Sequence, residues 1–184
     1  MTIFFTASFD GKKYYQKQYD FIVKAIQKTD VELISPELKN YQQSLRPSEI
    51  KKFKDPKILH YEAIRRSIEL ADAVIIDVTY SNTHIGYEIA LAAANKKYVL
   101  CLSLDEDFSE KINNRYVLGA KYTELTIDET IEDFVAKISK NILTERFNCF
   151  LSPAQILHVQ SRSLSENINM SEYIRELIDR DRKQ

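Results

Sequence analysis

The chain alternates between short apolar runs and longer segments in which apolar residues recur at helical spacing. Runs of strand length and composition occupy residues 2–6, 31–34, 73–78, 98–102 and 121–125. Helical spacing of apolar residues occurs at residues 14–29, 58–70, 85–95 and 129–142. Strands that alternate with helices are typical of an α/β domain, and we expect this domain to span residues 1–143.

The centre of the chain, residues 73–102, predicts two buried strands joined by one helix. A crossover of this kind normally joins parallel strands, and parallel sheets bind ligands beyond the carboxyl ends of their strands. We therefore expect the segment after Val78 to form one wall of a site. Asp77, at the end of the first strand, could contact a ligand or bond to loop amides.

Glu88 is the most informative charged residue of this central segment. It is the only acid between Val78 and Asn95, where no lysine or arginine occurs. A carboxylate on so apolar a helix must reach water, find a partner or shift its pKa. Groups placed in this way are candidate functional residues, and we interpret Glu88 as one rather than as a surface glutamate.

Two connections between elements add candidate chemistry. Residues 7–12, which include Ser8 and Gly11, lead from the first strand into a helix, so their backbone N–H groups could cradle an anion or a sugar. Residues 35–57 contain three prolines and predict a long irregular loop. Its basic residues could steer an anionic ligand, although we favour a solvated loop; they are Arg46, Lys51, Lys52, Lys54 and Lys57.

Residues 144–184 have a pattern of their own. A strand is predicted at 146–151, a helix at 153–166 and a second helix capped by Ser171. This segment resembles the ribbon-helix-helix module, notably in MSEYIRELI at 170–178, and the resemblance implies a dimer formed by strand pairing between two chains.

Charge decides between two roles for this tail. Residues 144–184 hold six basic and six acidic residues, and the outward side of the predicted strand would carry Arg146, Asn148 and Phe150. A net charge of zero and an outward phenylalanine favour dimerisation over DNA binding.

Composition narrows the function classes further. The formal net charge is −1, from 26 basic and 27 acidic residues, which removes any global electrostatic basis for binding nucleic acid or an anionic membrane. The sequence shows no signal peptide and no apolar run long enough to span a membrane. Cys101 and Cys149 lie in apolar contexts without a paired-cysteine metal motif, so we expect core thiols, a cytoplasmic protein and no metal or cofactor.

Three segments within residues 1–143 resemble the nucleoside 2-deoxyribosyltransferase superfamily, which includes 2′-deoxynucleoside 5′-phosphate N-hydrolases. They are IFFTASFDG at 3–11, ELADAVIIDVT at 69–79 and IGYEIALAAANKKYVLCLSLDEDF at 85–108. The resemblance implies a flavodoxin-like, Rossmann-like parallel sheet with helices on both faces. It also implies cleavage or transfer at the N-glycosidic bond of a nucleoside or nucleotide, with Glu88 as the nucleophile and Ser8 near the sugar or phosphate.

The proposed chemistry suits a carboxylate placed beside C1′ of a deoxyribosyl group. It stabilises an oxocarbenium-like transition state and forms a covalent glycosyl ester, which water or a second base opens with retention of configuration. We expect Gly86 to let the sugar approach closely and the helix dipole to favour the ionised form of Glu88.

The sequence departs from the family pattern at several positions. The family aspartate falls on Ile64, with Glu62 as the nearby carboxyl group, and the family tyrosine falls on Phe4. The loop glycine falls on Ala7, and the serine or aspartate before the nucleophile falls on Asn82, which could contact a ligand or cap the helix. Loss of a general acid typically slows a reaction by about 10²–10⁴-fold.

We interpret His84 as a loop histidine and Tyr87 as a packing residue. Three functions stay open at this point. The first is N-glycosidic cleavage or deoxyribosyl transfer through Glu88. The second is a non-catalytic nucleotide-binding domain fused to a dimerising or DNA-binding tail, and the third, which the sequence favours least, is glycosidic cleavage of NAD.

Overall fold

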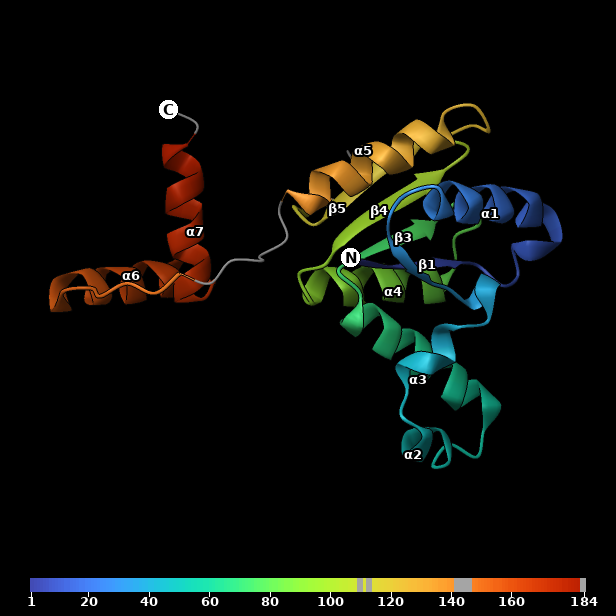
Figure 1. The fold of residues 1–184 in the computed structure, drawn as a ribbon, viewed down its shortest axis with the longest axis horizontal. Helices are drawn as coiled ribbons and strands as arrows, with labels where there is room; N and C mark the ends of the chain where they lie inside the picture. The colour runs from blue at the N-terminus through green and yellow to red at the C-terminus, as the bar shows by residue number, and fades with distance from the viewer. Residues whose placement is uncertain (109–110, 112–113, 141–146, 183–184) are drawn as a thin grey trace. The chain divides into compact units, whose positions relative to one another are not determined.

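Figure 1 shows the computed structural model, which describes residues 1–108, 111, 114–140 and 147–182. These residues belong to two compact units, 1–142 and 143–184, and each unit is described by itself. The first unit contains five parallel strands in the order β2-β1-β3-β4-β5, which confirms the predicted flavodoxin-like sheet. The strands are β1 (Thr2–Ala7), β2 (Glu32–Ile34), β3 (Ala73–Asp77), β4 (Tyr98–Ser103) and β5 (Val117–Lys121).

Helices cover both faces of this sheet (Figure 1). The α-helices of the first unit are α1 (Lys12–Gln27), α2 (Pro47–Ile50), α3 (Pro56–Leu70), α4 (Thr83–Ala94) and α5 (Ile127–Ser139). Helices α1 and α5 pack on one face, where Phe5 and Ile75 point, and helices α3 and α4 pack on the other, where Phe4 and Val74 point. Successive residues of a strand point to opposite faces, so Phe4, Thr6 and Ser8 share the face of α3 and α4.

Strand β5 does not lie where the sequence predicted it. Its ladder with β4 runs from Val99 opposite Val117 to Ser103 opposite Lys121, so the strand precedes the expected segment 121–125. Beyond Lys121, Tyr122 turns into the core and donates a hydrogen bond to Asp77 at 2.6 Å. The residues typical of strands in 121–125 therefore do not form a strand beyond Lys121. They comprise the buried Tyr122 and a turn that leads into α5.

The segment 35–57, predicted to be a long irregular loop, contains short helices. They are the 3₁₀ turns η1 (Pro36–Leu38) and η2 (Tyr41–Ser44) and the helix α2. The side chain of Asn40 stabilises this path because it accepts a hydrogen bond from the Ser35 N–H and donates one to the Leu33 carbonyl, both at 2.8 Å.

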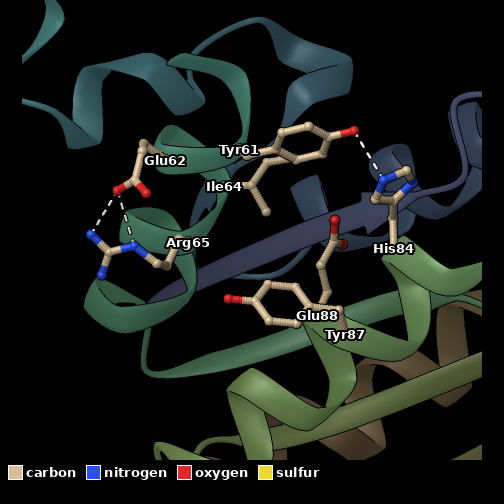
Figure 2. A pocket seen from close by; sticks show the side chains of 7 residues that line it. All are labelled: Tyr61, Glu62, Ile64, Arg65, His84, Tyr87 and Glu88. Atoms are coloured by element: carbon tan, nitrogen blue, oxygen red, sulfur yellow. Dashed lines mark hydrogen bonds and ion pairs between the residues drawn. The ribbon is translucent and has the colours of Figure 1, made fainter. Parts of the chain in front are cut away.

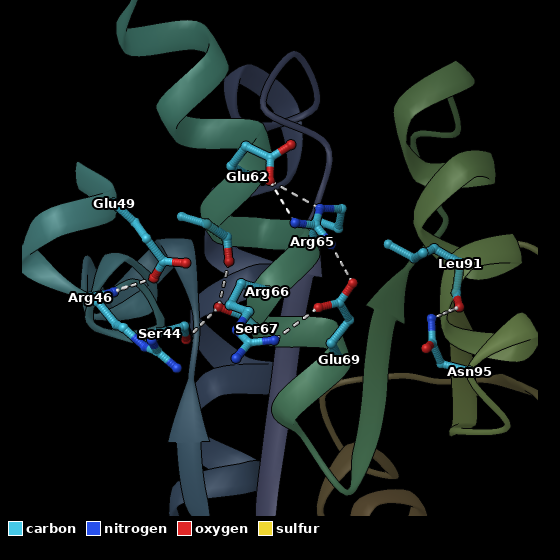
Figure 3. A network of polar contacts seen from close by, with 11 residues as sticks. Ser44, Arg46, Glu49, Glu62, Arg65, Arg66, Ser67, Glu69, Leu91 and Asn95 are labelled. Carbon is cyan, nitrogen blue, oxygen red and sulfur yellow. Dashed lines mark hydrogen bonds and ion pairs between the residues drawn. The ribbon is translucent and has the colours of Figure 1, made fainter. Parts of the chain in front are cut away.

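Polar contacts fix α3 against this segment (Figure 3). The hydroxyls of Ser44 and Ser67 are 2.8 Å apart, and Tyr41 Oη lies 2.8 Å from His60 Nδ1. Ion pairs of Arg65 with Glu62 and Glu69 join neighbouring turns of α3 itself. The contacts of Ser67 and His60 thus attach α3 to η2.

The second unit consists of α6 (Pro153–Ser165) and α7 (Met170–Asp181). Asn169, and not the predicted Ser171, caps α7 by accepting a hydrogen bond from the Glu172 N–H at 2.9 Å. Residues 147–152 form no strand in the single chain, and Arg146 lies outside the described residues. The strand predicted at 146–151 is therefore not observed over residues 147–151.

The two cysteines differ in their surroundings. Cys101 is fully buried in β4, and burial raises the pKa of its thiol to about 12. Cys149 is exposed, which corrects the expectation of a second core thiol, because no strand pairs with its segment in the single chain.

Candidate active site between α3 and α4

A pocket of about 310 Å³ lies between α3 and α4 on the sheet face that they cover. Its seven lining residues come from these two helices alone: Tyr61, Glu62, Ile64 and Arg65 from α3, and His84, Tyr87 and Glu88 from α4 (Figure 2). Spacings of three and four residues along each helix place these side chains on one face.

Glu88 lies at the bottom of this pocket, with 6% of its surface exposed. Thr6, from β1, hydrogen-bonds to its carboxyl group, while Oε2 accepts no hydrogen bond from any residue that the structure describes. Figure 2 shows the carboxyl group pointing into the space between Ile64, Tyr87 and His84. A buried carboxyl oxygen without a partner is uncommon in proteins and indicates a place for a ligand.

Burial raises the pKa of Glu88 from 4.5 to about 7, and the Thr6 hydrogen bond offsets part of this shift. We expected the helix dipole to favour the ionised form of Glu88, and this expectation is wrong because the pKa is raised. Glu88 is the sixth residue of α4, and the dipole acts mainly within the first turn, so desolvation dominates. Near neutral pH this carboxyl group exists in both protonation states.

His84 and Tyr61 form a polar pair at one end of the pocket. His84 Nε2 and Tyr61 Oη are 3.0 Å apart, and the two rings stack with centroids 5.2 Å apart. His84 belongs to the first turn of α4, one turn before Glu88, so the interpretation of His84 as a loop histidine is wrong. Tyr87, interpreted as a packing residue, is 59% exposed and lines the pocket.

Glu62 lines the same pocket but faces Arg65 (Figure 2). Its Oε2 accepts hydrogen bonds from Arg65 Nη2 at 2.7 Å and from Arg65 Nε at 3.0 Å. This ion pair raises the pKa of Arg65, with the Glu62 hydrogen bond as its largest cause. Glu62 is thus engaged with a cation on its own helix.

Ile64 presents an apolar side chain to the pocket at the position of the family aspartate. It is 6% exposed and packs in the same apolar cluster as Phe4, which is fully buried. Phe4 therefore supports the wall from below and does not line the pocket.

Ser8, Gly11 and Asn82 meet beside the start of α4. Ser8 Oγ accepts hydrogen bonds from Asn82 Nδ2 at 2.9 Å and from the Gly11 N–H at 3.3 Å. A Cβ atom on Gly11 would lie 2.3 Å from Tyr19 Oη and 2.8 Å from Tyr80 Cβ, so only glycine fits this approach. These three residues do not line the pocket of Glu88.

Asp77 and Gly86 have separate surroundings. The buried Asp77 points to the α1 and α5 face, where it accepts hydrogen bonds from Tyr122 and from the Thr79 N–H. Burial raises the pKa of Asp77, and these bonds oppose that rise. Gly86 is exposed, and a Cβ atom there would meet nothing within 4 Å, so packing within the protein does not require glycine at this position.

The sequence carried a signal for the residues that we missed. His84 and Glu88 are four residues apart, which places them on one helix face once the helix begins at Thr83. Tyr61 precedes Ile64 by three residues and shares its face of α3. Within the described ranges, no group of three or more metal-ligating side chains occurs and no helix is long and apolar enough to cross a membrane.

No family model matches this chain. Over 110 residues it is 30% identical to a protein of Methanosarcina mazei named "Putative 2′-deoxynucleoside 5′-phosphate N-hydrolase 1". This match covers 57% of the chain and 62% of the relative, so the chain spans less than two thirds of that relative's length.

Among solved structures, the CMP N-glycosidase BcmB of Clostridium botulinum matches with a TM-score of 0.50 at 14% identity, covering 74% of this chain and 99% of that one. A prokaryotic SEFIR domain matches with a TM-score of 0.43 at 16% identity, covering 82% and 98% respectively, which is too low to support an inference. The sequence match and the shared α/β fold support the resemblance to the nucleoside 2-deoxyribosyltransferase superfamily.

Proposed function

We propose that the chain cleaves the N-glycosidic bond of a nucleoside or nucleotide, with Glu88 as the nucleophile. The observation that carries the proposal is the buried Glu88 carboxyl group, whose unpartnered Oε2 points into a pocket lined by tyrosines and a histidine. A pocket of about 310 Å³ is at the lower end of the range for small-ligand sites. Aromatic walls suit the planar base of a nucleoside.

The reaction takes two steps at C1′ of the sugar. Ionised Glu88 Oε2 forms a bond to C1′ as the C1′–N bond breaks, and the electron pair of that bond leaves with the base. Water, or the nitrogen of a second base, then attacks C1′, and the ester electron pair returns to Glu88. Two inversions give net retention of configuration. Water as the acceptor gives hydrolysis, and a base as the acceptor gives deoxyribosyl transfer.

The relative's name supports this reaction class. A 2′-deoxynucleoside 5′-phosphate N-hydrolase cleaves the bond that Glu88 would attack, and we extend the activity to this chain as part of the proposal. The CMP N-glycosidase match adds the shared fold.

Our first prediction tests this activity directly. The full chain is incubated with a panel of nucleosides, 5′-nucleotides and NAD, and free base is measured by chromatography. We expect base release by the wild type and none by Glu88→Ala, because the nucleophile is gone, while the apolar helix tolerates alanine. Glu132→Ala, which removes an exposed acid of α5 on the other face of the sheet, is the control and should retain activity.

Each outcome of this experiment decides between the open functions. Base release that survives Glu88→Ala would contradict the nucleophile assignment. Release from NAD alone would indicate a glycohydrolase of that dinucleotide. Absence of release from every compound, with nucleotide binding retained, would favour a non-catalytic binding domain.

We also propose that the tail of residues 144–184 assembles two copies of the chain. Its two helices leave large apolar side chains in solvent, including Leu164 at 81%, Leu157 at 64% and Ile178 at 53% exposure. A groove of about 440 Å³ between α6 and α7 is lined mainly by apolar residues, among them Leu151, Val159 and Ile174. The charge balance of the tail favours a second copy over DNA as the partner.

A further inference from the structure

The proposed cleavage needs a proton donor for the departing base. When the C1′–N bond breaks, its electron pair stays on the base, and protonation of the base makes its departure easier. Glu88 cannot supply this proton, because it must be ionised to attack C1′. A second group in the pocket is therefore required.

The carboxyl candidates in the pocket are poorly placed for this role. Ile64 occupies the position of the family acid and has no proton to give. Glu62 accepts two hydrogen bonds from Arg65, so its carboxyl group is engaged with a cation on its own helix. Neither residue therefore provides a carboxylic acid that could protonate the departing base beside Glu88.

His84 is the histidine that lines the pocket, since His60 contacts Tyr41 outside it and His158 belongs to the tail. Histidine exchanges protons near neutral pH, which suits a group that must both donate and accept. His84 lies one turn from Glu88 on α4, and both side chains line the same pocket. Tyr61 Oη, 3.0 Å from Nε2, orients the imidazole from the other helix.

We propose that His84, oriented by Tyr61, protonates the leaving base, an inference that rests on the proposed glycosidic activity. In the first step, protonated His84 gives its proton to the base nitrogen that receives the electron pair of the broken C1′–N bond. In the second step, neutral His84 takes a proton from the attacking water as oxygen bonds to C1′ and the ester electron pair returns to Glu88. The sum is base release with consumption of one water, and His84 ends protonated as it began.

The test, our second prediction, compares two leaving groups. One substrate is the nucleotide that the wild type cleaves fastest, and the other is a nucleotide of N7-methylguanine, whose cationic base departs without protonation. His84→Gln keeps a polar group for Tyr61 but cannot carry a proton. We expect it to lower kcat by about 10²-fold or more on the first substrate and by less than about threefold on the second.

Two further variants separate proton donation from orientation and packing. Tyr61→Phe should lower kcat by about 10-fold on the first substrate, because one hydrogen bond of about 1.4 kcal/mol is lost, and should spare the second. His60→Gln is the matched control, a neighbouring histidine on α3 that packs on Tyr61 outside the pocket, and it should leave the ratio of the two rates unchanged.

Several results would overturn the proposal. An equal loss on both substrates in His84→Gln would mean that His84 only shapes the pocket, and no loss on either would remove it from the reaction. If His84→Gln gave one of these two results while Glu88→Ala released no base from either substrate, the proposed function would stand and only the role of His84 would fall. No base release by the wild type from either substrate would overturn the proposed function and the role of His84 together.

Discussion

At the scale of single residues, the carboxyl group of Glu88, our proposed nucleophile, lowers the stability of the fold near neutral pH. Its pKa is about 7 in the folded chain, against 4.5 for the ordinary side chain. Between these two values the folded protein keeps a proton that the unfolded chain releases. The free energy of unfolding therefore falls as the pH rises from 4.5 to 7, by up to about 3 kcal/mol for a shift of this size.

The third prediction follows from this dependence. Glu88→Gln replaces the carboxyl group with a neutral amide of the same shape. We therefore expect its free energy of unfolding at pH 8 to exceed that of the wild type by about 2–3 kcal/mol. At pH 4.5 the difference should largely vanish, because the wild-type carboxyl group is then neutral in the folded state. Urea unfolding at the two pH values measures the gap.

A control from the same pocket sharpens the comparison. Glu62→Gln removes a partly exposed ion pair with Arg65 and should change the unfolding free energy by less than about 1 kcal/mol at either pH. If the free energies of unfolding of Glu88→Gln and the wild type differed by the same amount at both pH values, burial of the charge would not be the cause of the difference.

The sequence identified Glu88 but not His84, and the difference has a physical origin. Glu88 stood out because its neighbours are uncharged, and such isolation is visible without coordinates. His84 was missed because the helix was predicted to begin at Ile85, whereas the Asn82 side chain accepts a hydrogen bond from the Ile85 N–H and the helix begins at Thr83. Capping contacts set helix ends, and three adjacent residues here suit the cap equally well.

At the scale of elements, Asn82 joins two parts of the site. Its Oδ1 accepts from the Ile85 N–H at 3.0 Å, and its Nδ2 donates to Ser8 Oγ at 2.9 Å. The cap thereby ties the first turn of α4, which carries His84, to the loop after β1.

For the fourth prediction, Asn82→Ala should lower the free energy of unfolding by about 1–2 kcal/mol, because the cap and the partly buried hydrogen bond to Ser8 are lost. It should also slow base release, since His84 lies in the turn that the cap holds. Asn95→Ala, at the other end of α4, removes a bond from Nδ2 to the Leu91 carbonyl (Figure 3) and is the control. Equal effects of both variants on activity would argue against a role of the Asn82 cap in the site.

Prediction of the strands from sequence worked where the sheet is buried on both faces. The apolar runs of β1, β3 and β4 lie in the middle of the sheet and are almost wholly buried. The edge strand β5, VLGAK, is only partly buried, and its place depends on pairing with β4 rather than on its own composition.

At the scale of the whole molecule, the tail is too small to stand alone with its apolar residues exposed. The fifth prediction is that light scattering will give the full chain a mass twice its 21.5 kDa and a chain truncated after Leu143 the mass of one copy. Leu164→Glu should also separate the copies. Leu125→Glu is the control: Leu125 lies in the first unit and is 93% exposed, against 81% for Leu164, and the substitution should leave the mass unchanged.

The same number of copies in the full chain and in the truncated chain would remove the dimerisation proposal. A salt titration against DNA tests the alternative role of the tail, because binding through phosphate contacts weakens steeply with added salt. Sequence-selective binding that weakens in this way, and whose sequence preference is relaxed in Arg146→Ala or Asn148→Ala, would favour operator binding.

His84 and Glu88 share one helix, whereas Tyr61 faces them from another. The pitch of α4 therefore sets the spacing between the proposed proton donor and the proposed nucleophile, whatever the packing between α3 and α4. Helix α3 is attached to η2 through Ser67 and His60, so a shift of that segment would move Tyr61 and Ile64 relative to His84 and Glu88. Such a shift would change the width of the pocket and leave the distance along α4 between His84 and Glu88 unchanged.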